Sequence, residues 1–222
     1  MRRRRFTYPG ALALCVIAAF AIAQPVAAAP RQASPQDLWT VPTRPATDFT
    51  ILVAYSFGNR IPAGVDPTRT VGQPGPVNEA LADAVVATRG TRTVPIYAQT
   101  EIASVLHGKY GLTDVIEIGP DQAPDGTLVY LSTDGVAKKV ASLRGPRAGD
   151  DVVGVIAFSD HQWRSVYTTV AAGFHAYGPA GIAMPATYDP FSGQDWTRSR
   201  ESYLPRDIAG RVALLPQLVS AS

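Results

Sequence analysis

Apolar residues along the chain fall into short, nearly continuous runs separated by segments with helical spacing. Runs at residues 49–55, 93–98 and 151–158 are rich in Ile, Val and Leu with few polar interruptions. Such runs are typical of strands that are covered on both faces. Shorter runs at 114–118 and 127–131 are further strand candidates, and a last strand is predicted around Ile182.

Apolar residues three and four positions apart predict the helices between these strands. One helix begins at Pro76 and ends at Gly90, and a second begins near Thr100, which can cap it, and ends at Gly108 or Gly111. Two more are predicted at 132–145, capped by Ser132 or Thr133, and at about 160–172, before a helix-rich tail with Pro205 at a helix start.

This alternation predicts an α/β fold built from right-handed βαβ units, with a mostly parallel sheet between two helical layers. Residues 49–55 are expected to form the central strand. They are followed by a connection, 56–76, that is too long for an ordinary turn and is rich in proline and glycine. Connections of that length are often functional.

The N-terminus has the pattern of an export signal. Arg2 to Arg5 precede an apolar stretch at 11–23, and three alanines at 27–29 provide the small residues of a cleavage site. The apolar stretch is short for a membrane span, so a cleaved signal is preferred. The alternative is an uncleaved anchor, which is the one membrane contact that the sequence predicts. The arginines fit both the general and the twin-arginine route. Localisation is therefore expected to be extracellular or in the cell envelope.

Residues 30–47 carry four prolines and are expected to form an extended spacer, so a single folded domain should occupy 48–222. Without the four signal arginines, 16 basic residues face 18 acidic ones, and the formal charge becomes −2. Scattered arginines and a negative balance disfavour nucleic acid as a partner. The only cysteine, Cys15, lies in the signal, which leaves no disulfide or thiolate site in the mature protein.

His161 and Arg164 are the strongest candidates for chemistry. They follow the 151–158 strand, and their spacing places them on one face of the next helix, near its free N–H groups. A guanidinium and a helix start can hold a phosphate or a carboxylate, while an imidazole can transfer protons near neutral pH. The alternative is that both residues pair with surface carboxylates.

Other candidates lie where neighbouring strands end. Thr133 and Asp134 open one helix and Glu101 opens another; capping and the helix dipole are the alternative explanations for them. Ser159 competes with Asp160 for a cap, and Gly58 would let a ligand approach the backbone.

Several site classes lack their motif. Gly-x-Gly-x-x-Gly, Gly-x-x-x-x-Gly-Lys-Ser/Thr and Gly-x-Ser-x-Gly are all absent from the sequence, so no nucleotide fingerprint or serine nucleophile elbow is present. No ligand spacing supports a metal site formed by His161, Asp160, Asp134 or Glu101. The sequence does not identify a cofactor or an oligomeric state.

Three segments together resemble the YdcF, SanA and ElyC-like family, a domain of largely unknown function in bacterial envelope proteins. They are Ser159 to Ser165 with its His and Arg, Leu131 to Ala137 with its Ser and Thr, and Gln99 to Ile102 with its Glu. The chain departs from the family pattern at Tyr97-Ala98-Gln99, where a Ser-Gly-Gly turn is usual, and at Asn78-Glu79, where an arginine is common. The Asn of the Thr-containing motif is also missing.

The resemblance implies a three-layer Rossmann-like sandwich with a pocket at the carboxyl ends of the strands. Some relatives look like binders of S-adenosylmethionine, and others are linked to the envelope barrier and to peptidoglycan or lipid-carrier metabolism. We therefore expect an exported domain that binds a phosphorylated or otherwise anionic small molecule. His161 would exchange protons, Glu101 would act as a base or orienting group, and Arg164 would clamp the anion. Turnover of the ligand is left open. The alternative is a non-catalytic interaction or scaffold domain.

Overall fold

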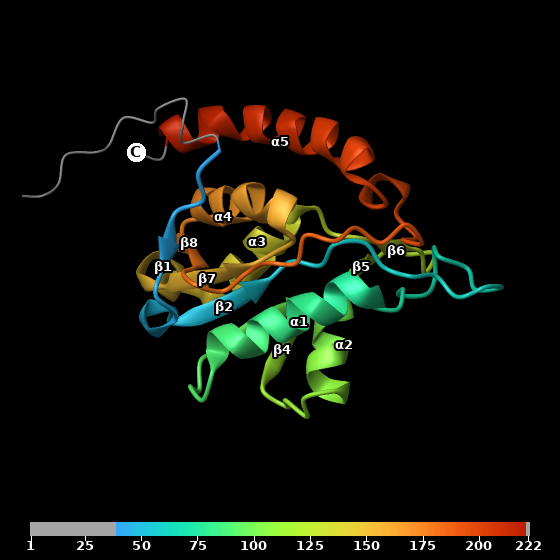
Figure 1. Cartoon of the computed structure of the whole chain (residues 1–222), viewed down its shortest axis with the longest axis horizontal. Helices are drawn as coiled ribbons and strands as arrows, with labels where there is room; N and C mark the ends of the chain where they lie inside the picture. The colour runs from blue at the N-terminus through green and yellow to red at the C-terminus, as the bar shows by residue number, and fades with distance from the viewer. Residues whose placement is uncertain (1–38, 221–222) are drawn as a thin grey trace, which may run out of the picture. The chain divides into compact units, whose positions relative to one another are not determined.

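The computed structural model describes residues 39–220, drawn in colour in Figure 1. The predicted signal peptide, Cys15 and residues 30–38 of the predicted spacer lie outside the described residues. A six-stranded parallel sheet is the centre of the described part, with strand order β1-β8-β7-β2-β3-β4. Its strands are β1 (Thr43–Arg44), β2 (Ile51–Ala54), β3 (Ile96–Gln99), β4 (Val115–Ile118), β7 (Val152–Ile156) and β8 (His175–Pro179).

Helices cover both faces of this sheet, as the α/β prediction required. On one face lie α1 (Gly75–Arg89) and α2 (Thr100–Gly108); on the other lie α3 (Thr133–Arg144) and α4 (Gln162–Ala171). The last helix, α5 (Arg200–Ser220), packs on α4 and forms an outer layer (Figure 1).

Alternate residues of β2 explain why the sheet is covered on both sides. Leu52 and Ala54 belong to the core against α1 and α2, whereas Ile51 and Val53 belong to the core against α3 and α4. All four side chains are buried. A strand that is apolar at every position gains hydrophobic stabilisation from both layers, which explains its interior place between β7 and β3.

The chain reverses direction across the sheet between β2 and β7. From β2 it adds β3 and then β4 on one side, and it returns to add β7 and β8 on the other. After β2 the chain continues to α1 on one face of the sheet, and after β7 it continues to α4 on the other face. The two connections therefore diverge at the carboxyl ends of β2 and β7. This is where open α/β sheets place their ligands.

Some boundaries differ from the sequence predictions. The last strand is β8 at His175–Pro179, before the predicted position around Ile182. Its Gly and Pro give the segment a low strand propensity, and pairing with β7 and β1 stabilises it as a strand. The sheet also begins earlier than Asp48, with β1 inside the predicted spacer. Pro205 lies inside α5 and not at its start.

Two smaller predictions concern the region between β4 and α3 and the start of α2. The 127–131 strand is only β6 (Leu128–Val129), which pairs antiparallel with β5 (Asp121–Gln122) outside the main sheet. Thr100 does not cap α2 but is its first residue, and its hydroxyl donates to Glu117 Oε1 at 2.6 Å. Ser132 caps α3 as predicted, accepting from Gly135 N.

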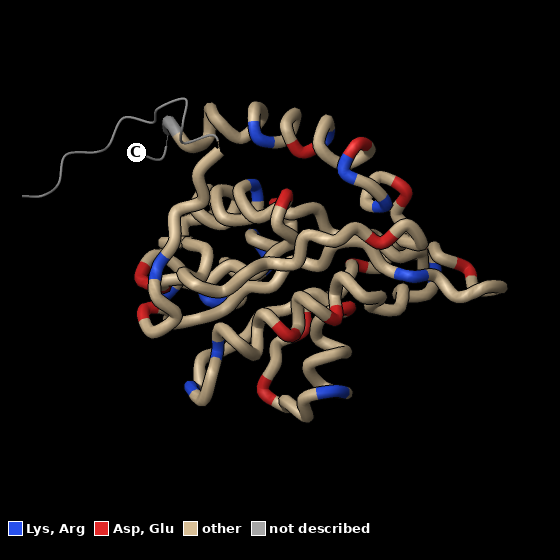
Figure 2. The backbone as a smooth tube through the Cα atoms, viewed as in Figure 1, with Lys and Arg blue, Asp and Glu red and all other residues tan. Residues whose placement is uncertain are grey.

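Short 3-10 turns connect several elements: η2 (Ala46–Asp48), η3 (Gly145–Asp150), η4 (Ser159–His161) and η5 (Asp195–Thr197). Acidic and basic residues are interspersed along the elements in the view of Figure 2. Over residues 39–220, no helix has the length and apolar character of a membrane span.

Candidate functional site

A cavity of about 510 Å³ lies at the carboxyl ends of β2, β3 and β7, and we call it the strand-end cavity. Ser56 and Gly58 reach it just after β2, Gln99 from the end of β3, and His161 just after β7. The start of α3 and the segment that contains η5 complete its wall. The cavity is lined by four of the residues that the sequence singled out: His161, Arg164, Thr133 and Gly58.

His161 is buried and forms the junction of η4 with α4. Its Nε2 lies 3.3 Å from the hydroxyl oxygen of Thr133 at the start of α3. Its Nδ1 lies 3.7 Å from Asp207 Oδ1, and within the described residues this nitrogen has no hydrogen-bond partner. Burial and, next, the nearby Arg164 lower the pKa of His161 to about 4, so the imidazole is neutral at neutral pH.

Arg164 leaves α4 one turn after His161 and holds three groups together. Its guanidinium donates to Thr133 Oγ1 at 3.0 Å, to the Tyr203 hydroxyl at 3.0 Å and to Asp207 Oδ1 at 2.9 Å. Tyr203 in turn donates to Asp207 at 3.2 Å. The side chain keeps about a quarter of its surface exposed, and it lines the strand-end cavity.

Asp207 is the electrostatic centre of this network. It is fully buried, and its second oxygen, Oδ2, accepts from Arg211 Nε at 2.6 Å. Burial alone would raise the pKa of Asp207, but contacts with His161 and Arg164 outweigh it, and the pKa lies below its usual range. With His161 neutral, one carboxylate faces two guanidinium groups, so Arg164, Asp207 and Arg211 together carry one net positive charge.

Thr133, His161 and Asp207 stand in the order hydroxyl, imidazole, carboxylate, which is the order of a nucleophile, its base and an orienting acid. Two features weaken this set as a catalyst. Nδ1 and the carboxylate are 3.7 Å apart, beyond hydrogen-bond range, and an imidazole with a pKa of about 4 is a weak base at neutral pH. The set is better suited to ligand binding than to turnover.

Glu101 lies in the first turn of α2 and is buried. It is not among the residues that line the strand-end cavity, although Ser56 and Asn59, whose side chains it contacts, do line it. Burial raises the pKa of Glu101, while hydrogen bonds with its own backbone and with those side chains act in the opposite direction. Glu101 therefore supports the cavity wall and has no direct access to it.

The remaining candidates divide between the cavity and the surface. Thr133 and Gly58 line the cavity; Gly58 has φ +68°, and a Cβ there would lie 2.4 Å from Ser192 Oγ, so local packing by itself requires glycine. Asp134 turns outward to Lys138 at 2.8 Å. Ser159 is exposed and caps no helix, and neither it nor Asp134 lines the cavity.

Sequence reasoning missed the contribution of α5, namely Tyr203, Asp207 and Arg211. These residues share one helix face at spacings of four, a signal that the sequence does contain. Nothing local indicates that this face packs on His161 and Arg164, because the contact depends on how α5 docks on α4.

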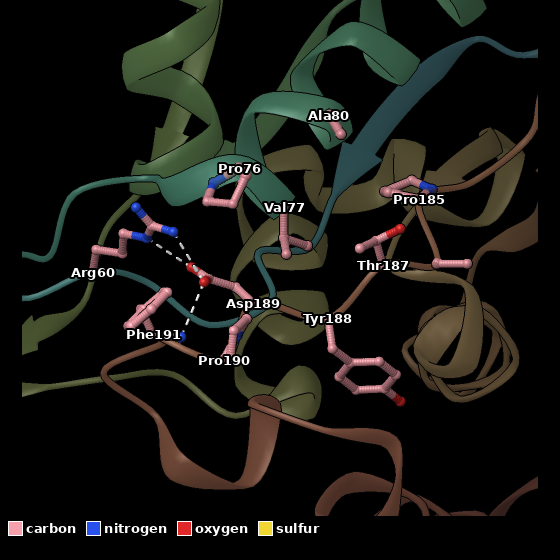
Figure 3. Close-up of a pocket in the computed structure, with 11 residues that line it drawn as sticks. Arg60, Pro76, Val77, Ala80, Pro185, Thr187, Tyr188, Asp189, Pro190 and Phe191 are labelled. Atoms are coloured by element: carbon pink, nitrogen blue, oxygen red, sulfur yellow. Dashed lines mark hydrogen bonds and ion pairs between the residues drawn. The ribbon is translucent and has the colours of Figure 1, made fainter.

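A second cavity, of about 440 Å³, lies between the start of α1 and the segment 185–191 (Figure 3). Its walls are mostly proline, alanine and aromatic carbon. Its charged groups satisfy each other, since Arg60 donates to both oxygens of Asp189 at 2.8 and 3.0 Å. None of the candidate residues from the sequence lines it, so the strand-end cavity is the candidate site.

Within the described part of the chain, no cluster of three or more His, Cys, Asp or Glu residues has the arrangement of a metal site. Comparisons with family models, with curated proteins and with solved structures found no match to this chain. Functional assignment therefore depends on the geometry of the strand-end cavity.

Proposed function

We propose that this protein is an exported, envelope-associated domain that binds a phosphorylated or similarly anionic small molecule in the strand-end cavity. The observation that carries the proposal is the convergence of Arg164, His161 and the start of α3 on one cavity whose described lining contains no carboxylate. Export is proposed from the N-terminal signal pattern.

Three features of the cavity favour an anion. Arg164 supplies a permanent positive charge, and a guanidinium pairs well with the oxygens of phosphate. The first turn of α3 presents backbone N–H groups and the positive end of a helix dipole beside Thr133. The surrounding network retains one net positive charge after Asp207 is counted.

The resemblance to the YdcF, SanA and ElyC-like family is part of this proposal. It is supported by the Rossmann-like arrangement of the sheet and by the position of His161 and Arg164 just after β7.

A thermal-shift panel on the purified protein tests the binding proposal. Inorganic phosphate, sugar phosphates, polyprenyl phosphates, nucleotides and divalent metals are each compared with sodium chloride at equal ionic strength. A ligand at 100 times its Kd stabilises the folded state by about 2.7 kcal/mol, a readily measured rise in Tm. Product analysis of every stabilising compound then separates binding from turnover.

Arg164→Gln should lose most of the anion-dependent rise, measured from its own Tm without ligand. Arg147→Gln is the matched control, because Arg147 is exposed on η3 and lies outside the cavity lining. Equal anion stabilisation of the Arg164→Gln protein and the unmodified protein would reject the site, and a panel without any stabilising anion would reject the function.

The competing function, a non-catalytic interaction or scaffold domain, is favoured by one observation. Arg164 already binds Asp207, Tyr203 and Thr133, so the same contacts serve to dock α5 onto α3 and α4. In that case Arg164→Gln lowers the stability of the protein, and no anion in the panel stabilises it.

A further inference from the structure

The strand-end cavity is much larger than a phosphate ion needs. It measures about 510 Å³, whereas one water molecule occupies about 30 Å³ of liquid. Cavities of this size enclose whole metabolites. The cavity therefore has room for an anion that carries a second group, and the rest of the lining indicates the chemistry of that group.

Apart from Arg164, the described lining is uncharged, because His161 is neutral and no Asp, Glu or Lys reaches the cavity. One guanidinium matches one phosphate group. An ammonium group on the ligand would find no carboxylate in the described lining, and a second phosphate would find no second cation in it. The second group of the ligand is therefore neutral.

Neutral hydrogen-bonding side chains line the rest of the cavity. Gln99 accepts from Ser56 N at 2.9 Å through Oε1, which leaves its Nε2 without a partner in the described residues. The carboxamide of Gln194 likewise makes no hydrogen bond with the described residues. Each amide offers donor and acceptor atoms, which match hydroxyl groups because a hydroxyl also does both.

An indole ring borders the same space. Trp196 lines the cavity with 37% of its surface exposed, and the Arg206 guanidinium lies 5.1 Å from its ring centroid. An exposed aromatic ring beside free amides suits a molecule with C–H faces and a hydroxyl rim. Gly193, between Gln194 and Ser192, adds backbone without a side chain.

We propose that the ligand of the strand-end cavity is a sugar monophosphate, with its phosphate at Arg164 and the start of α3 and its sugar ring between Trp196, Gln194 and Gln99. This inference rests on the proposed function and adds the class of its ligand. A nucleoside monophosphate is the competing small molecule, and it is an arm of the test.

Isothermal titration calorimetry of the full protein tests the proposal with five probes: inorganic phosphate, glucose, glucose 1-phosphate, N-acetylglucosamine 1-phosphate and AMP. At least one sugar phosphate should bind about tenfold more tightly than inorganic phosphate, glucose and AMP, a difference of about 1.4 kcal/mol. If no probe binds, the sugar phosphate assignment is overturned, and the proposed function fails with it only if no anion of the thermal-shift panel stabilises the protein. If inorganic phosphate binds as tightly as both sugar phosphates, or AMP binds most tightly, only the sugar assignment is overturned.

Variants locate the sugar ring. Gln194→Ala and Trp196→Phe should each weaken binding of the best sugar phosphate by about three- to tenfold, a loss of about 0.65 to 1.4 kcal/mol, and leave the affinity for inorganic phosphate unchanged. Arg164→Lys should weaken both. Trp39→Phe is the matched control, since Trp39 is exposed and lies outside the cavity lining. Unchanged sugar phosphate affinity in Gln194→Ala and Trp196→Phe would place the sugar elsewhere and overturn the proposal.

Discussion

Replacing Asp207 by Asn removes the carboxylate that pairs with two guanidinium groups, those of Arg164 and Arg211. Asp207 has no exposed surface, and the side chains of Arg164 and Arg211 keep only 24% and 11%. Breaking a buried ion pair from one side costs about 3 to 5 kcal/mol, because the remaining charge is left without compensation. For a domain of this size that loss corresponds to a fall in Tm of about 6 to 20 °C.

The measurement is thermal and urea unfolding of Asp207→Asn beside Asp83→Asn. Asp83 is the matched control: it also accepts from two side chains, Lys109 and Tyr110, but half of its surface is exposed. An exposed pair contributes about 0 to 1 kcal/mol, so Asp83→Asn should change little. Equal losses in the two variants would refute the reasoning that burial gives the Asp207 network its energy.

Acid titration gives a second check of the same network. The folded pKa of Asp207 is depressed, so its contribution to stability is present above the unfolded pKa of about 3.9 and is lost as the pH falls below it. Wild-type protein should therefore lose this part of its stability below about pH 4, whereas Asp207→Asn, which starts lower, should lose less.

Two further predictions concern His161 and the sheet. The folded pKa of His161, about 4, lies below its ordinary value of 6.5, so the unfolded chain binds the proton first and the free energy of unfolding should fall as the pH drops from 6.5 to 4. In His161→Asn, the free energy of unfolding measured by urea titration should change less with pH across that window. The same pH dependence in the variant and in the unmodified protein would contradict this prediction. Gly154→Ala should destabilise the domain by about 1 to 3 kcal/mol in the same assay, because a Cβ at this position in β7 would lie 2.6 Å from Phe49 and 2.7 Å from Leu52. Gly149→Ala is the control, since a Cβ there would meet no atom within 4 Å. Equal stability of the two variants would refute the prediction, because it would show that the sheet accommodates the methyl group.

The fold class was predictable because β2, β7 and their helices carry strong local patterns. A strand that is apolar at every position, such as residues 51–54, has to be covered on both faces, and this alone indicates a sheet between helices. Strand β8 was misplaced because its residues, His-Ala-Tyr-Gly-Pro, have weak strand propensity, and only pairing with β7 and β1 makes them a strand.

The candidate site was predictable in part for the same reason. His161 and Arg164 follow β7, whose carboxyl end lies beside that of β2, so their place at this edge of the sheet follows from topology. Thr133 follows β6, which lies outside the main sheet, so topology alone does not bring it there. Asp134 was grouped with them by its position in the sequence, but it turns to Lys138, since neighbouring residues of a helix project in different directions. Asp207 could not be placed, because no local pattern specifies where α5 docks.

The position of Asp207 along the chain has a consequence for how the charged network is assembled. Ribosomes make proteins from the N-terminus, so every strand of the sheet and both Arg164 and His161 are synthesised before the acid that balances them. Until α5 docks, only water compensates the charge of Arg164, because its carboxylate partner Asp207 is not yet in place. Docking of α5 therefore completes the charged network, and a chain that stops before it would carry a complete sheet with an uncompensated cation at the strand-end cavity.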